Sequence, residues 1–122
     1  MQNFDIEQHG SVVTVTAHEA ELSYPQMRRL DDDLFQRVDS HGAKNFVFDM
    51  AEVQFLDSSC IGRLIALLEH VKPAGGRIVL ANCHSNVELL FRMTHIDTLI
   101  NLVDSVDQAL EACCAAVSDV KL

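Results

Sequence analysis

Blocks of apolar residues recur along the chain, and the first of them predicts strands near the N-terminus. Val12 to Thr16 is built of Val and Thr throughout, which favours a strand covering about residues 11–17. A preceding strand is expected at residues 3–8, and the intervening His9-Gly10 suits a tight turn. These two elements should therefore form an antiparallel hairpin.

A change to apolar residues spaced three and four apart then predicts an amphipathic helix. Four residues follow this spacing: Met27, Leu30, Leu34 and Val38. Ser23 suits the N-cap, Pro25 the first turn, and Gly42 the position just after the last turn. The run Asp31-Asp32-Asp33 is expected to lie mostly on the opposite side, as a solvated acidic face.

The rest of the chain alternates between short apolar runs and helical spacing. Buried strands are predicted at residues 45–50, 77–82 and 100–103, and helices at residues 58 to about 72, 85 to about 93, and from about 105. The last helix is expected to bury Val106, Ala109, Leu110, Cys113 and Val117. Strands that alternate with helices indicate an α/β fold with a mixed, mainly parallel sheet of four to five strands and about four helices.

Length and charge narrow the class of protein. A chain of 122 residues has room for one domain, expected over residues 3–118. The formal charge of −9 argues against binding to nucleic acid or to an anionic membrane, and favours a protein partner with a basic contact surface. Two features point to the cytoplasm: the N-terminus does not resemble a signal peptide, and the cysteines fit small core residues (Cys60, Cys83, Cys113 and Cys114).

The segment after the strand at 45–50 breaks the apolar pattern and holds the candidate chemistry. Asp57-Ser58-Ser59 stands where a loop meets the helix predicted from residue 58. One interpretation is an ordinary helix cap, in which a side-chain oxygen accepts hydrogen bonds from first-turn amides. The other is a phosphorylation switch, because a helix N-terminus tolerates an anion and a phosphate would add up to two negative charges.

Residues 47–62 (Val-Phe-Asp-Met-Ala-Glu-Val-Gln-Phe-Leu-Asp-Ser-Ser-Cys-Ile-Gly) resemble the core motif of STAS domains, in particular the bacterial anti-sigma factor antagonists. That motif is an aspartate-containing strand, an acidic-hydrophobic turn, and then Asp-Ser-Ser/Thr-Gly-hydrophobic-Gly. The Gly75-Gly76 turn and the helix from Ser85 also match the family. The resemblance therefore implies a single STAS-like domain across nearly the whole chain.

The resemblance implies partner switching without catalysis. In the family, a GHKL-type serine kinase that is also an anti-sigma factor phosphorylates the serine after the aspartate, which is Ser58 here. Asp57 resembles the acidic neighbour that positions this serine, and Ser59 occupies the second hydroxyl position. The unphosphorylated protein binds the kinase and frees the sigma factor, and a PP2C-type phosphatase restores that form. The residues expected to contact partners are Asp57, Ser59, Cys60, Glu21, Ser23, Gly62 and Arg63.

The chain departs from the family pattern at two places. Cys60 replaces the usual glycine, and Ser23 replaces an aspartate on the rim that faces the kinase. Both departures bear on which partner is bound, and they fit a diverged module that controls an output other than a sigma factor. Arg63 is open to two interpretations, as part of the functional edge or as a solubilising helix residue.

Other chemistries have little support in the sequence. The six histidines form no metal-binding spacing, no nucleophile elbow surrounds Ser58, and no cofactor motif is present. Two alternatives to switching remain open: a constitutive STAS subunit of a stressosome or lipid-transport complex, in which Ser58 is structural, and a module that binds a small molecule or nucleotide. The family resemblance further implies a monomer in the free state.

Overall fold

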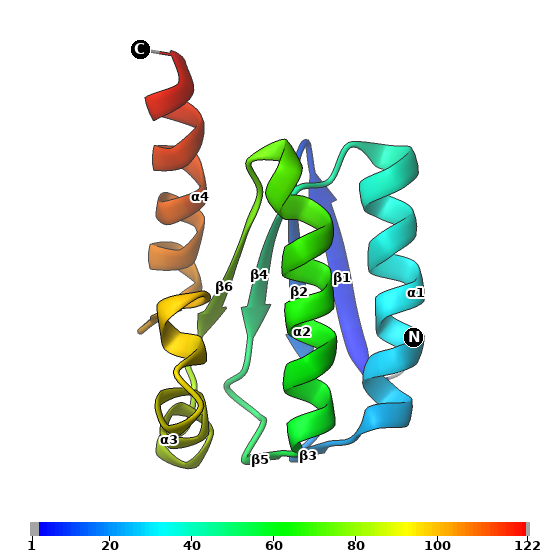
Figure 1. Ribbon diagram of the computed structural model, residues 1–122, viewed down its shortest axis with the longest axis vertical. Coiled ribbons are helices and arrows are strands. Elements are labelled where there is room, and N and C mark those ends of the chain that lie inside the picture. Colours follow the sequence, from blue (N-terminus) through cyan, green and yellow to red (C-terminus); the bar gives the residue numbers. More distant parts are fainter. Residues whose placement is uncertain (1–2, 122) are drawn as a thin grey trace.

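A five-stranded sheet forms the centre of the computed structural model, which describes residues 3–121 and the side chains of residues 3–113 (Figure 1). The strand order is β1-β2-β4-β6-β7, with β1 at Phe4–His9, β2 at Val12–Ala17, β4 at Asn45–Asp49, β6 at Arg77–Ala81 and β7 at Asn101–Val103. β1 pairs antiparallel with β2, and the other neighbours pair in parallel. The predicted hairpin and mainly parallel sheet are both confirmed.

Residues 3–121 contain four α-helices: α1 at Tyr24–His41, α2 at Ser58–Val71 and α3 at Ser85–Met93 lie between strands, and α4 at Val106–Lys121 follows the last strand. Short 3-10 helices follow α2 and α3, η1 at Lys72–Ala74 and η2 at Ile96–Thr98. Ser23 is the N-cap of α1, as predicted, and its backbone amide donates to Gln26 Oε1 at 2.9 Å. Gly42 ends α1 with φ of 71°, a left-handed conformation that a glycine adopts without steric cost.

The sheet separates two hydrophobic cores. Along β4, Phe46 and Phe48 point into the larger core, which α1, α2 and α3 cover, whereas Val47 points into a smaller core on the other face. Helix α4 covers that second face, on the far side of the sheet from α1 and α2 (Figure 1). Both faces of β4 and β6 are therefore buried, which explains why their sequences are apolar without alternation.

The last helix and the cysteines follow the predictions in part. Within α4, Ala109 and Cys113 are buried as expected, whereas Val106 and Leu110 are only half-buried. Cys60 is also buried, and Cys83 is half-buried. The side chains of Cys114 and Val117 lie outside the described residues.

The expectation of a solvated Asp31-Asp32-Asp33 face is wrong for its first residue. The Asp31 side chain is fully buried, while Asp32 is exposed and Asp33 is half-buried. Position 31 lies one helical turn after Met27, so it continues the buried face of α1. The carboxylate is tolerated there because Arg63 of α2 donates to it at 2.6 Å.

A second, two-stranded sheet was not predicted. β3 (Glu21–Leu22) pairs in parallel with β5 (Phe55–Leu56), and both are too short to show a sequence pattern. They lie beneath the N-terminal ends of α1 and α2 (Figure 1). This pairing places the loop before α1 against the loop before α2.

Candidate functional site

Asp57 caps the N-terminus of α2. Its backbone is extended, and its Oδ1 accepts a hydrogen bond from the Cys60 amide at 3.0 Å. The carboxylate thereby satisfies one of the first-turn amides, which have no partner inside the helix. The cap predicted from the sequence is confirmed, and Asp57 is the residue that supplies it.

Ser58 and Ser59 are the first two residues of α2, and both are exposed. Within the part of the chain that the structure describes, neither hydroxyl forms a hydrogen bond. One turn further along, Gly62 is exposed, and a Cβ added there would meet no atom within 4 Å. The surface beside Ser58 is therefore open to an approaching molecule.

The β3–β5 pairing brings Glu21 and Ser23 to the same rim as Asp57. The Ala20 carbonyl accepts from the amides of Gln54 at 2.7 Å and Phe55 at 3.0 Å, and the Asp57 amide reaches the Leu22 carbonyl at 3.4 Å. A shallow groove along this rim, here called the rim groove, is lined by Glu21, Leu22, Ser23, Phe55, Leu56 and Asp57. The structure thus unites the candidate residues before α1 with those before α2.

Phe55 is part of this rim, although sequence reasoning did not single it out. Its ring is 53% exposed, which is unusual for a phenylalanine in a domain with a well-buried core. The signal in the sequence was present but weak: Phe55 belongs to the motif segment and lies outside any regular apolar pattern. The rim therefore combines carboxylates with an exposed aromatic ring, and aromatic side chains are enriched where proteins contact one another.

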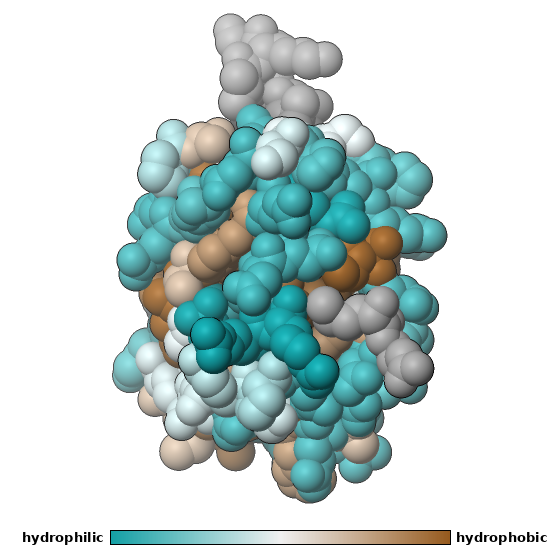
Figure 2. Space-filling view, turned by 90° about the vertical axis from the view of Figure 1, so that its right-hand side faces the viewer, coloured by the Kyte–Doolittle hydropathy of each residue, from teal (hydrophilic) through white to brown (hydrophobic). Residues whose placement is uncertain are grey.

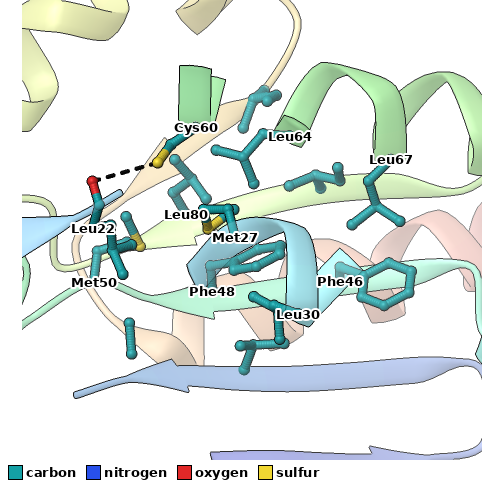
Figure 3. Close-up of a cluster of buried hydrophobic side chains, with 14 of the residues drawn as sticks. Leu22, Met27, Leu30, Phe46, Phe48, Met50, Cys60, Leu64, Leu67 and Leu80 are labelled. Atoms are coloured by element: carbon teal, nitrogen blue, oxygen red, sulfur yellow. Dashed lines mark hydrogen bonds between the residues drawn. The ribbon is translucent and has the colours of Figure 1, made fainter. Parts of the chain in front are cut away.

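Cys60 is not available to a partner, contrary to its place among the expected contact residues. Its side chain is fully buried beside Leu22 and Leu64, and its thiol donates to the Leu22 carbonyl at 3.4 Å (Figure 3). Burial, together with the nearby Asp57, raises the pKa of this thiol to about 12. The cysteine that replaces the family's glycine therefore acts through packing, by tying α2 to β3.

For Arg63, the sequence left open a place at the functional edge or a solubilising role on the helix surface, and its contacts match neither role alone. Its side chain is 27% exposed, and its Nε donates to Asp31 Oδ2 at 2.6 Å, while the buried Asp31 Oδ1 has no hydrogen-bond partner among the described residues. Burial raises the pKa of Asp31 to about 6, although the hydrogen bond from Arg63 acts in the opposite direction. Arg63 therefore connects α2 to α1 through Asp31, one helical turn along α2 from Ser59.

Two histidines hold the loop between β4 and β5 that leads to the rim. His18 bridges two carboxylates, with Nε2 2.8 Å from Asp5 Oδ2 and Nδ1 2.7 Å from Glu52 Oε2. The hydrogen bonds to Asp5 and Glu52 raise the pKa of His18 above its ordinary value. His84 Nε2 lies 2.7 Å from the Ala51 carbonyl and donates to it. All six histidines are exposed, and in the described residues no group of three His, Cys, Asp or Glu side chains is arranged to hold a metal ion.

Fold and site together define a small α/β domain in which exposed serines begin a helix beside their capping aspartate. The chain belongs to the STAS domain family, whose sequence model matches residues 3–109. The match agrees with the motif at residues 47–62 and with the observed order of strands and helices. In residues 3–121, no helix is both long enough and apolar enough to cross a membrane.

Curated relatives share part of this sequence. A protein of Thermotoga neapolitana named as an anti-sigma factor antagonist is 24% identical over 78 residues, covering 64% of this chain and 69% of its own. A STAS-domain containing protein of Pseudomonas aeruginosa is 29% identical over 70 residues, covering 57% of this chain and 68% of its own.

Solved structures share the whole fold. The anti-sigma factor antagonist SpoIIAA in its unphosphorylated form superposes with a TM-score of 0.82 at 15% identity, covering 92% of this chain and 96% of its own. RsbS of Moorella thermoacetica, solved as a serine-to-glutamate variant, gives a TM-score of 0.75 at 13% identity and covers 98% of both chains. The chain therefore has the fold of an anti-sigma factor antagonist.

Proposed function

We propose that this protein is a non-enzymatic regulator that switches partners according to the phosphorylation of Ser58. The observation that carries the proposal is the exposed Ser58 hydroxyl at the first turn of α2, directly after the capping Asp57. Its partners are a GHKL-type serine kinase that acts as an anti-sigma factor and a PP2C-type phosphatase. The relation to proteins named anti-sigma factor antagonists supports this choice of partner class.

Two further facts support phosphorylation as the signal. SpoIIAA, which shares this fold, has been solved in unphosphorylated and in phosphorylated form, with TM-scores of 0.82 and 0.73 to this chain. The helix N-terminus can also hold a phosphate without refolding, because its first amides point outward and its dipole favours an anion. The folded domain can therefore exist in both states.

The effect of the phosphate on binding follows from the charges of the rim. Glu21 and Asp57 already make the rim acidic, and phosphoserine adds about −1.5 to −2 charges at neutral pH. A partner surface that fits closely over the Ser58 hydroxyl and the open space beside Gly62 has no room for a phosphate, and burying the phosphate there removes its hydration even where basic residues lie nearby. Phosphorylation then turns binding off, while the unmodified protein holds the anti-sigma factor and releases the sigma factor.

The site assignment is tested by phosphate incorporation. The purified chain is incubated with the cognate kinase and ATP, and intact-mass analysis follows the wild type, Ser58→Ala and Ser59→Ala. One phosphate is expected on the wild type and on Ser59→Ala, and none on Ser58→Ala. A phosphate retained by Ser58→Ala would contradict the assignment. If no variant accepts phosphate and the chain co-purifies stably with other subunits, a constitutive STAS subunit is the better description.

A further inference from the structure

The solvent-facing side of α1 carries a groove that the phosphorylation site does not use. Five residues line this α1 groove: Tyr24, Pro25, Arg28, Arg29 and Asp32. They form two rows along the helix, in which residues follow one another at a spacing of four: Tyr24, Arg28 and Asp32 in one row, and Pro25 and Arg29 in the other. Both rows lie opposite the buried face of α1 that holds Met27 and Leu34. Figure 2 looks onto this side of the molecule, where the surface is mainly hydrophilic.

Arg28 and Arg29 differ from the other arginines in having no partner within the described residues. The other arginines are all engaged: Arg37 with Asp33, Arg63 with Asp31, Arg92 with Glu88, and Arg77 with the Ala112 carbonyl. In a chain with a formal charge of −9, two adjacent exposed guanidiniums without carboxylate partners are a distinct local feature. They are free to bind a carboxylate from another molecule.

Tyr24 links the α1 groove to the rim groove. Its ring is 41% exposed and lines the α1 groove, whereas its chain neighbour Ser23 lines the rim groove beside Asp57. A standard protein interface covers about 800 Å² on each partner, which corresponds to a circle of about 16 Å radius. Because the two grooves adjoin at Ser23 and Tyr24, a partner that covers Ser58 with an interface of this size has the α1 groove within its reach.

We propose that the α1 groove binds an acidic segment of the same partner protein that covers Ser58. The inference rests on the proposed function and specifies its contact surface. The rim presents Glu21 and Asp57, and the α1 groove presents Arg28 and Arg29, so the two grooves have opposite charge. A partner with a basic region over the rim and an acidic segment over α1 docks in one orientation only.

The composition of the groove limits what can occupy it. Asp32 offsets one of the two arginines, which leaves a local charge of +1 (2 − 1) within an acidic molecule. That charge suits a short segment with one or two carboxylates, and is too small to hold a nucleic-acid backbone. The exposed Tyr24 ring adds an apolar contact and a stacking surface for a peptide.

The experiment measures binding of the purified cognate kinase to chains that carry Ser58→Ala, so that phosphorylation cannot intervene. In this background, R28E/R29E is compared with K44E/K72E, which changes the charge equally at the opposite end of the sheet. We expect R28E/R29E to weaken binding at least tenfold and K44E/K72E to change it less than threefold. Equal effects of both pairs, or no effect of R28E/R29E, would overturn the proposal.

A second measurement identifies the contact directly. R28K/R29K keeps both charges and supplies amines that a carbodiimide couples to neighbouring carboxylates. We expect a zero-length cross-link from position 28 or 29 to an Asp or Glu of the kinase; cross-links from Lys44 or Lys72 alone would contradict the proposal. If kinase binding depends on the arginines but the same kinase transfers no phosphate to Ser58 of the wild-type chain, the proposed function is refuted while the α1 groove stands. No binding to Ser58→Ala would overturn both.

Discussion

Asp31 on α1 and Arg63 on α2 form an ion pair across the helix interface, with Nε and Oδ2 2.6 Å apart and the aspartate fully buried. Arg63→Ala would leave a buried carboxylate without its partner, which should cost roughly 3–5 kcal/mol of unfolding free energy near pH 7. Urea denaturation measures this loss. The double variant D31L/R63M, which removes both charges, should unfold within about 1 kcal/mol of the wild type.

The same pair predicts a pH dependence. The pKa of Asp31 is raised from 3.8 to about 6, so the folded state binds its proton more tightly than the unfolded state does. Its contribution to stability is full below about pH 4 and is lost as pH rises through 6. Arg63→Ala should therefore regain stability relative to wild type between pH 7 and pH 5. An unchanged difference at the two pH values would contradict the buried pair.

Gly62 is expected to lower the stability of the folded protein and to leave room for the kinase beside Ser58. A glycine inside a helix costs about 0.5–1 kcal/mol relative to alanine, and the structure shows no close contact or left-handed backbone that requires it. Gly62→Ala is therefore expected to raise the unfolding free energy by about that amount while weakening kinase binding beside Ser58. Glu69→Ala, on the same face two turns away, is the matched control and should leave binding unchanged.

Asp57 combines a capping role with a charge, and two substitutions separate them. Asparagine caps a helix as well as aspartate, so Asp57→Asn should preserve thermal stability, whereas Asp57→Ala should cost about 1 kcal/mol. If the carboxylate also positions Ser58 for the kinase, both variants should lower the phosphorylation rate measured by intact mass. A normal rate in Asp57→Asn would confine the residue to capping.

His18 should titrate above the ordinary pH range of a histidine. Both ring nitrogens face carboxylate oxygens, an arrangement that only the doubly protonated ring satisfies. Its pKa is raised, so the stabilisation is full below about 6.5 and is lost as pH rises through the folded-state pKa. Proton NMR of the ring measures this pKa directly. Asp5→Asn and Glu52→Gln should each lower it, and a value at or below 6.5 in the wild type would contradict the bridge.

Much of the fold was predictable because it depends on local periodicity. The apolar spacing of α1 and the unbroken apolar runs of β4 and β6 identified these elements and implied a parallel sheet. The β3–β5 pairing was not predictable, since its two-residue strands gain their partners only when distant segments meet. It is this pairing that joins Glu21 and Ser23 to the rim.

The candidate site was predicted in part for a similar reason. Asp57 and the two serines are local features of a helix start, and they lie where the sequence placed them. The burial of Asp31 had a usable signal, because position 31 follows Met27 by one turn, but its partner Arg63 is set by how α1 packs on α2. Cys60 was expected at the contact surface from its motif position, and helix geometry turns it inward instead.

The central claim is that one phosphate on Ser58 turns partner binding off. The direct measurement is the affinity of the purified kinase for the unmodified chain and for the same chain stoichiometrically phosphorylated at Ser58, at fixed salt. The charge and desolvation of the phosphate predict a loss of about 100-fold, equivalent to about 3 kcal/mol. Affinities that agree within threefold would contradict the switch, even if the kinase phosphorylates Ser58.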